Sequence, residues 1–230
     1  MTDVTDLGAV LAVWAHPDDE TYLTGGLFGA LTDIGHRVAC ITATRGEAGG
    51  ATGTAGRLAR LRTEELDAAL KVLGVEEHHW LDYPDGGCAD VDADAAANRV
   101  AAVMDDVRPD TVVTFGPDGY TGHPDHCAVS AWTGRAVAQC RNPPRLLHAV
   151  SREAVVDPAL DEDFGVFELG RPRVCADEDM AVLLHLDGAA LDRKVEALQR
   201  QISQTGVLID AVGLERYRAW VATEAFAEPE

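Results

Sequence analysis

The chain has 230 residues, of which 47% are hydrophobic, and its formal net charge is -20. This length and apolar content allow one sizeable core. The excess of carboxylates disfavours binding to nucleic acid or to an anionic membrane, because both need a cationic face. The five cysteines form no CxxC pair, so we expect free thiols in a reducing compartment. We therefore predict a cytoplasmic protein that acts on a small molecule, with homo-oligomerisation left open.

Strand-like and helix-like segments alternate along the first 150 residues. Short apolar and β-branched runs predict strands over 9–14, 37–43, 78–81, 111–115 and 146–151. Apolar residues at helical spacing predict helices over 21–34, 58–73, 94–107 and 125–138. After a weaker stretch, we expect a strand over 182–186 and helices over 191–203 and 214–225. This alternation is typical of βαβ units, so we predict a single α/β domain over 1–230, with a mostly parallel sheet between two helical layers.

Two clusters of histidine and aspartate each follow a predicted strand. His16, Asp18 and Asp19 lie in the sequence AHPDDE directly after the first strand. His123 and His126 lie in GHPDH, which begins seven residues after the fourth strand. In the common strand order 3-2-1-4-5 the first and fourth strands are neighbours, and ligands bind at their carboxyl ends. We therefore expect both clusters to meet over one crevice.

Two imidazoles and a carboxylate are suited to holding one Zn²⁺ per chain, with a fourth position open for water. A bound zinc ion would lower the pKa of that water and polarise a carbonyl group. Because Asp18 and Asp19 are adjacent, one can bind the metal while the other accepts the proton of the water. His123 would then donate a hydrogen bond to an oxyanion or protonate a leaving nitrogen. Iron or cobalt remain alternatives to zinc.

Helix capping is the competing interpretation of both clusters. An aspartate after proline is a good N-cap, and proline is common at helix starts. Two such turns, each after a strand and before a helix, favour the metal site. Asp125 has two interpretations, because it could cap its helix or orient a ligand histidine.

Together the two clusters resemble the PIG-L/LmbE-like deacetylases, the N-acetylglucosaminyl deacetylase family. TRGEAG at 44–49, LDYPDG at 81–86 and KVEALQRQISQ at 194–204 also resemble family segments. The resemblance implies a Rossmann-like three-layer sandwich and a zinc amidohydrolase. It implies His16, Asp19 and His126 as metal ligands, Asp18 as general base, and His123 as the group that assists at the oxyanion and the leaving group.

The resemblance also implies that Arg62 and Asp85 bind sugar hydroxyls, as in the thiol-cofactor branch of the family. From the residues alone, Arg62 could equally pair with Glu65 on a solvated helix face. Asp85 could serve only its Pro-Asp-Gly turn. The thiol-cofactor branch has a tyrosine at the position of Thr121, whereas this chain has Tyr120 one residue earlier.

We therefore predict a zinc-dependent de-N-acetylase that acts on an N-acetylglucosamine-type or related N-acylated small molecule. The alternatives are a zinc hydrolase of another amide or carbamoyl bond, and a Rossmann-like module with a non-catalytic metal site. A nicotinamide dehydrogenase is disfavoured, because the glycine-rich stretch at 46–56 contains neither GxGxxG nor a P-loop. We expect that stretch to form a mobile loop beside the pocket.

Overall fold

The computed structural model describes residues 2–50, 54–152 and 164–230. Over these residues the chain forms a seven-stranded sheet in the order β3-β2-β1-β4-β5-β7-β6. The strands in chain order are β1 Val10–Trp14, β2 Val38–Thr44, β3 Glu77–Tyr83, β4 Thr111–Phe115, β5 Arg145–Val150, β6 Val182–His185 and β7 Thr223–Ala227. Strands β1 to β5 are parallel, whereas β7 is antiparallel to β5 and β6. The prediction of a mostly parallel sheet is confirmed.

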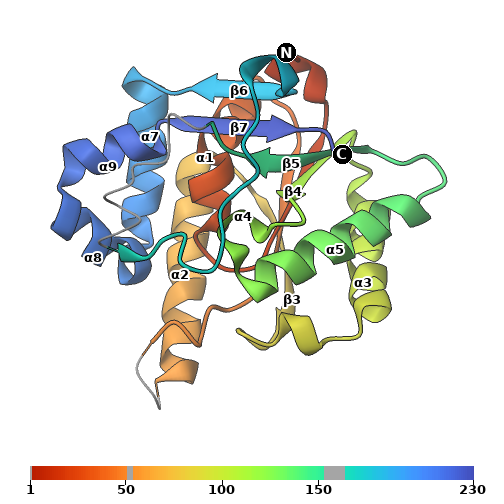
Figure 1. Ribbon diagram of the computed structural model, residues 1–230, viewed down its shortest axis with the longest axis horizontal. Coiled ribbons are helices and arrows are strands. Elements are labelled where there is room, and N and C mark those ends of the chain that lie inside the picture. The colour runs from red at the N-terminus through yellow and green to blue at the C-terminus, as the bar shows by residue number, and fades with distance from the viewer. Residues whose placement is uncertain (1, 51–53, 153–163) are drawn as a thin grey trace.

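Helices cover both faces of the sheet. The α-helices of the described residues are α1 Asp19–Asp33, α2 Ala55–Leu73, α3 Ala93–Val107, α4 Gly119–Gly122, α5 Pro124–Gln139, α7 Gly188–Arg200, α8 Ile202–Val212 and α9 Leu214–Val221. Helices α1, α2 and α7 pack together on one side, and α3 packs with α5 on the other (Figure 1). Short 3₁₀ turns are η1 Val4–Leu7, η2 Cys88–Asp90 and η4 Asp177–Asp179. This is the Rossmann-like three-layer sandwich expected from the sequence.

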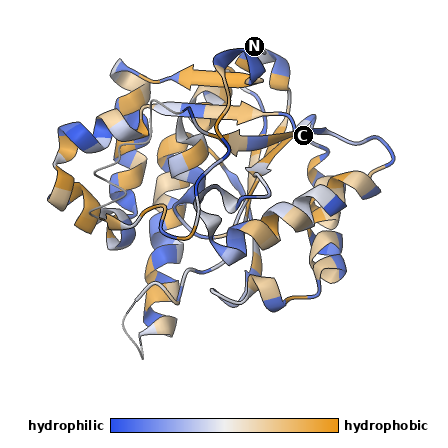
Figure 2. Ribbon diagram, in the orientation of Figure 1, coloured by the Kyte–Doolittle hydropathy of each residue, from blue (hydrophilic) through white to orange (hydrophobic). Residues whose placement is uncertain are grey.

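The central strands form the core. Every residue of β1, β2 and β4 is buried, and Figure 2 shows the strands as mostly hydrophobic ribbon. Parallel strands covered on both faces need such continuous apolar runs, which explains why they were recognisable in the sequence. All five cysteines are free thiols, as expected. Among the helices of the described ranges, none combines the length and apolar character that crossing a bilayer requires.

Two predictions for the C-terminal part are wrong in detail. The last helix, expected over 214–225, ends at Val221, and Thr223–Ala227 forms β7. The alanine and glutamate content of this segment favours a helix locally, but pairing with β5 and β6 on both sides overrides that preference. The helix expected over 191–203 ends at Arg200, and α8 begins at Ile202.

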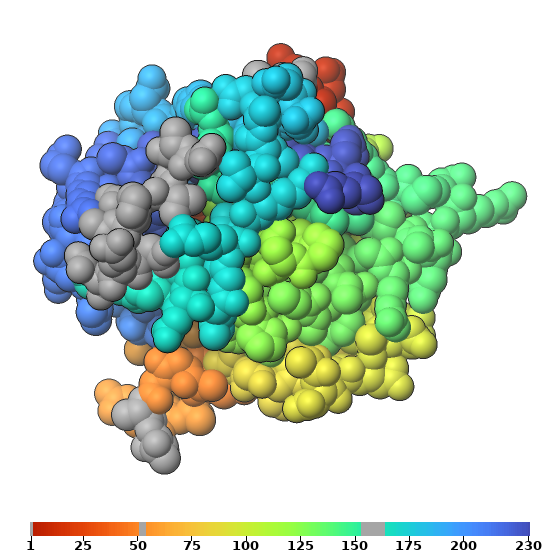
Figure 3. Space-filling model, in the orientation of Figure 1, coloured from red at the N-terminus to blue at the C-terminus, as the bar shows by residue number. Residues whose placement is uncertain are grey.

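The segment over residues 164–180 crosses one face of the molecule. In Figure 3 it lies between the C-terminal helices and the region of α4 and α5. It is tied to β5, because the amide of Ser151 donates to the carbonyl of Arg173 at 2.9 Å. It also approaches α4 so closely that a Cβ atom at Gly122 would overlap the backbone of Leu169. Glycine is therefore required at this contact, which also has a positive φ of 76°.

A buried ion pair joins the first helix to the end of the sheet. Lys194 on α7 and Glu224 on β7 are both fully buried, 2.7 Å apart. The Glu224 carboxylate accepts hydrogen bonds from the amides of Gly26 and Leu27, inside α1. Lys194 donates to the carbonyl of Tyr22. In an α-helix the amide of Gly26 pairs with the carbonyl of Tyr22. Glu224 therefore bonds the donor of this helical hydrogen bond, and Lys194 bonds its acceptor.

Candidate active site

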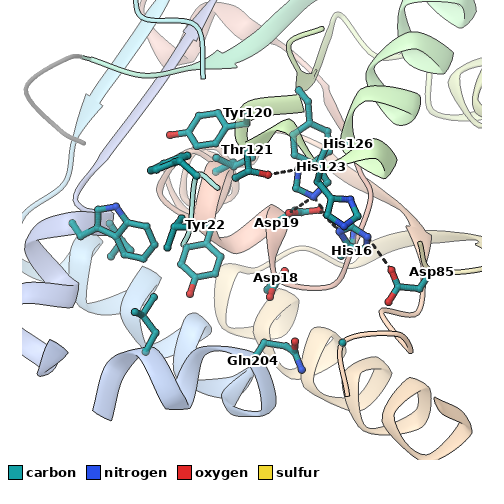
Figure 4. Close-up of a pocket in the computed structure, with 18 of the residues that line it drawn as sticks. His16, Asp18, Asp19, Tyr22, Asp85, Tyr120, Thr121, His123, His126 and Gln204 are labelled. Atoms are coloured by element: carbon teal, nitrogen blue, oxygen red, sulfur yellow. Dashed lines mark hydrogen bonds and ion pairs between the residues drawn. The ribbon is translucent and has the colours of Figure 1, made fainter. Parts of the chain in front are cut away.

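The candidate residues gather at the carboxyl ends of the central strands. His16 follows β1 by two residues and Asp85 follows β3 by two residues, while His123 and His126 lie beyond β4 on α4–α5. Strands β1 and β4 are neighbours in the order 3-2-1-4-5, as predicted. This is the topological switch point at which open α/β sheets bind ligands. Figure 4 shows both clusters facing one cavity.

Three candidate ligand side chains converge on one point. His16 Nδ1 lies 3.1 Å from His126 Nε2. Asp19 places Oδ2 3.7 Å from His16 Nδ1 and Oδ1 3.5 Å from His126 Nε2. Ligands about 2.0–2.1 Å from a tetrahedral zinc ion lie about 3.3 Å from one another. The spacing of these three groups therefore suits a metal ion bound between them.

Hydrogen bonds on the outer side of each imidazole fix which nitrogen carries a proton. His126 Nδ1 faces the carbonyl of Gly119 at 2.9 Å and must donate to it. His16 Nε2 faces Asp85 at 3.0 Å and Asp125 at 3.2 Å, and donates to these carboxylates. In the neutral rings, the two nitrogens that face each other carry lone pairs. Lone pairs in contact at this distance repel unless a cation, either a proton or a metal ion, lies between them, so the donor set is suited to binding a metal ion in place of that proton.

The surroundings of the two rings differ in charge. Burial alone would lower the pKa of His16, but hydrogen bonds to Asp125 and Asp85 and the charge of Asp19 outweigh burial and raise it to about 10. This position therefore favours a positive charge. Burial lowers the pKa of His126, which keeps that ring neutral and able to bind a metal.

Capping does not explain the two clusters. Asp18 precedes α1 without a side-chain capping hydrogen bond, and α5 is capped by His123, whose Nδ1 accepts from the amide of Asp125. The Asp125 carboxylate is buried and points instead to His16 and to the amides of Gly86 and Cys88. Of the two interpretations of Asp125, contact with a candidate ligand histidine is therefore confirmed.

Asp18 is held in an uncommon backbone conformation beside the candidate metal ligands. Its φ is 109°, which costs a non-glycine residue on the order of 1–3 kcal/mol. Its amide donates to Glu20 Oε2 at 2.9 Å, and Arg62 donates to the carbonyl of Pro17. The peptide between residues 17 and 18 is thus held from both ends. Burial raises the pKa of the Asp18 carboxyl to about 7, although Arg62 opposes that rise.

Glu20 is the residue of the first motif whose contribution the sequence did not indicate. It is fully buried, and its second oxygen accepts from Thr21 and from Gln201 Nε2 at 2.6 Å. Burial raises its pKa. Glu20 therefore links the Asp18 backbone to the segment between α7 and α8. Only its place in AHPDDE could have drawn attention to it.

His123 presents a hydrogen-bond donor to the cavity. Because its Nδ1 accepts from the amide of Asp125 at 3.2 Å, the proton of the neutral ring is on Nε2. Burial lowers the pKa of His123, which favours that neutral form. One of its ring nitrogens lies within 4.8 Å of those of His16 and His126. The donor is therefore beside the point where the candidate ligands converge.

Arg62 and Asp85 both line the cavity. The solvated pairing of Arg62 with Glu65 is wrong, because both side chains are buried and Glu65 bonds Ser203 instead. Arg62 Nη1 donates to the carbonyl of Gly46, and a Cβ atom at that glycine would overlap the guanidinium. Asp85 contacts His16 and accepts from the amide of Ala48 at 2.7 Å, so it does more than form its turn. Sugar binding by either residue stays a prediction.

The cavity has a volume of about 510 Å³, in the usual range for small-molecule sites. Of the glycine-rich stretch, Ala48 and Gly49 line it as expected, while residues 51–53 lie outside the described residues. Tyr120 lines it too, with a φ of 63°, and Thr121 contacts His126 Nδ1 at 3.3 Å. Side chains of α8 and α9 form a further wall of the cavity, which was not predicted because no sequence motif marks it.

The family model PIG-L, described as GlcNAc-PI de-N-acetylase, matches residues 11–137, which is more than half of the chain. The chain belongs to the PIG-L family. A relative in Thermobifida fusca (strain YX) is named 1D-myo-inositol 2-acetamido-2-deoxy-alpha-D-glucopyranoside deacetylase. It is 31% identical over 86% of this chain and 84% of its own length.

Another relative matches over less of its length. A protein of the same name in Mycobacterium sp. (strain KMS) is 40% identical over 64% of this chain but only 56% of its own length. This chain thus spans about half the length of that relative. Among solved structures, the A40926 pseudoaglycone deacetylase superposes with a TM-score of 0.67, covering 97% of each chain at 19% identity. That likeness supports the fold alone.

Proposed function

We propose that this member of the PIG-L family is a metal-dependent de-N-acylase, which hydrolyses the amide of an N-acetylglucosamine-type small molecule. The observation that carries the proposal is the cavity in which two inward-facing imidazole lone pairs and the Asp19 carboxylate meet, with Asp18 beside them. The names of the relatives support the same chemistry. The five free thiols are compatible with a cytoplasmic location, which we also propose.

His16, Asp19 and His126 would hold the metal, and zinc is the ion that we propose for this donor set. Zinc bound there supplies a Lewis acid that polarises the amide carbonyl and lowers the pKa of a water molecule to about 7. Asp85 and Asp125 hold His16 in the tautomer that directs its lone pair toward the metal.

The protein groups divide the proton transfers between them. Asp18, with its pKa near 7, takes one proton from water as the oxygen attacks the amide carbon. His123 donates its Nε2 hydrogen toward the oxyanion of the tetrahedral intermediate. Asp18 then returns the proton to the nitrogen as the carbon–nitrogen bond breaks. The carboxylic acid so formed then loses its remaining proton and the released amine gains one. One amide and one water thus give one carboxylate and one ammonium group, so atoms and charge balance.

The test is release of acetate by zinc-loaded protein from a panel of N-acetylglucosamine compounds. The panel contains free N-acetylglucosamine, N,N'-diacetylchitobiose, and inositol-linked and malate-linked forms. Asp18→Ala should abolish release yet retain zinc, because Asp18 is not a proposed ligand. Asp94→Ala, which changes an exposed aspartate on α3, should behave as the unmodified protein. Zinc bound with no release from any compound would contradict this substrate class, and loss of zinc in Asp18→Ala would contradict the assigned role.

A further inference from the structure

The cavity has two ends of different character. At one end Asp18, Arg62 and Asp85 line it, together with the backbone near Gly49. Figure 4 shows Tyr22 on the opposite side of Asp18 from Asp85. The side chains at that other end, which we call the apolar lobe, come from α1, α8 and α9 and belong to one hydrophobic cluster: Tyr22, Leu208, Trp220 and Val221.

The aromatic wall of the apolar lobe is held in place from behind. The Tyr217 hydroxyl donates to the Tyr22 hydroxyl at 2.8 Å, and Tyr217 itself is fully buried. The Trp220 ring lies 5.7 Å from the Tyr22 ring and 5.9 Å from the Tyr217 ring, which are contacts typical of packed aromatic pairs. The lobe is therefore a preformed apolar surface, as small-molecule sites usually are.

The character of the two ends sets the orientation of an N-acylated amino sugar. Its amine part carries hydroxyl groups, which suit the end lined by Asp18, Arg62 and Asp85. Its acyl part carries hydrocarbon, which suits the opposite end. The methyl group of an acetyl substituent is too small to cover side chains that three different helices supply.

We propose that the apolar lobe binds the hydrocarbon chain of an N-acyl group longer than acetyl, so that the preferred substrates are N-alkanoyl amino sugars. The proposal rests on the proposed function, because it assigns the acyl side of the same amide. Each methylene buried contributes about 0.8 kcal/mol, and about 1.36 kcal/mol is tenfold in rate. The expected rise in kcat/KM is therefore about fourfold for each added methylene, until the lobe is filled.

The experiment compares N-acetyl-, N-butanoyl- and N-hexanoylglucosamine with zinc-loaded protein. All three release the same amine, glucosamine, so one assay serves the series. We expect kcat/KM for the hexanoyl compound to exceed that for the acetyl compound on the order of 100-fold. Leu208→Asn should lower this ratio, because it places an amide in the apolar lobe. Val207→Asn is the matched control on the same helix: Val207 is 76% exposed, and its substitution should leave the ratio unchanged.

Two further measurements separate the possible failures. The octyl glycoside of N-acetylglucosamine tests the opposite orientation, in which the apolar lobe binds the aglycone. The inference would be overturned if kcat/KM rose relative to N-acetylglucosamine for this compound but not for the hexanoyl amide. A flat acyl series with acetate still released would overturn it too, yet leave the proposed function intact. If no compound released amine, the proposed function would fail. Calorimetry on Asp18→Asn would then test whether the apolar lobe binds the acyl chain. Tighter binding of N-hexanoylglucosamine than of N-acetylglucosamine would support this role, and equal binding would refute it.

Discussion

Replacing Glu20 with alanine should slow hydrolysis without removing the metal. Glu20 accepts the amide hydrogen of Asp18, and a hydrogen bond to a charged group contributes about 1.5–3 kcal/mol. The φ of 109° at Asp18 stores strain of comparable size. Without Glu20 the peptide between Pro17 and Asp18 can relax to a less strained conformation. Returning the Asp18 carboxylate to its reactive orientation would then cost about as much energy as the lost hydrogen bond contributed. We therefore expect kcat to fall about 10- to 150-fold, with zinc content unchanged.

Glu20→Gln provides the critical comparison. The glutamine oxygen can still accept from the Asp18 amide, while its NH₂ group meets Gln201. Gln201 Oε1 is buried and has no hydrogen-bond partner among the described residues, so rotation of that amide would satisfy both groups. Glu20→Gln should thus stay within about threefold of the unmodified protein, since the hydrogen bond to Asp18 persists.

The assay is kcat for amine release, with zinc content measured on the same samples. Ile41→Val is the control for stability: it shortens a core side chain on β2 at a cost of about 1 kcal/mol and should keep kcat. Equal losses in Glu20→Gln and Glu20→Ala would refute the hydrogen-bond argument. Full activity in Glu20→Ala would show that catalysis does not require Glu20 to hold the peptide between Pro17 and Asp18.

Three other changes test the site and the fold. Asp125→Asn should weaken zinc binding about 10- to 100-fold, because it removes a carboxylate partner of His16; competition with a chromogenic chelator measures this, and unchanged affinity would contradict it. Lys194→Met should lower the free energy of unfolding by about 3–5 kcal/mol in urea titrations, because Glu224 remains buried without its cation; a loss below 1 kcal/mol would count against it. His78 has a pKa lowered by burial to about 4, from 6.5. The unfolded chain therefore binds this proton first, and stability should fall as pH drops from about 6.5 to 4. His78→Asn should reduce that slope, and an identical slope would refute the assignment.

Much of the fold could be predicted, because the residues within most of its elements favour the secondary structure that those elements adopt. The strands β1, β2 and β4 are fully buried runs of mostly apolar residues, and the spacing of each His-Pro-Asp motif after its strand places both at one sheet edge. Strand β7 could not be predicted, because only its neighbours β5 and β6 make Thr223–Ala227 extended. The break between α7 and α8 was missed for a similar reason: Gln201 leaves the helix where it bonds Glu20.

The candidate site shows the same division between local and distant information. The residue types of the motifs indicated metal ligands and a base. The contacts that orient them come from distant segments: Asp85 on the loop after β3 and Asp125 on α5 both reach His16. The hydrogen bonds of Arg62 to the backbone of Pro17 and Gly46 were likewise not predicted. Sequence patterns indicate the type of a residue and the periodicity of its neighbours. These contacts depend instead on which distant segments the fold brings together.

The ion pair of Lys194 and Glu224 has a consequence for biosynthesis. Helix α1, which begins beside Asp18, leaves the ribosome long before β7. Two of its amides are bonded by a carboxylate that lies 198 and 197 residues further along the chain. A nascent chain therefore carries both histidine motifs long before α1 can reach its final form. We expect ribosome-bound chains that stop before β7 to be sensitive to proteolysis within α1, and emergence of β7 to give protection there.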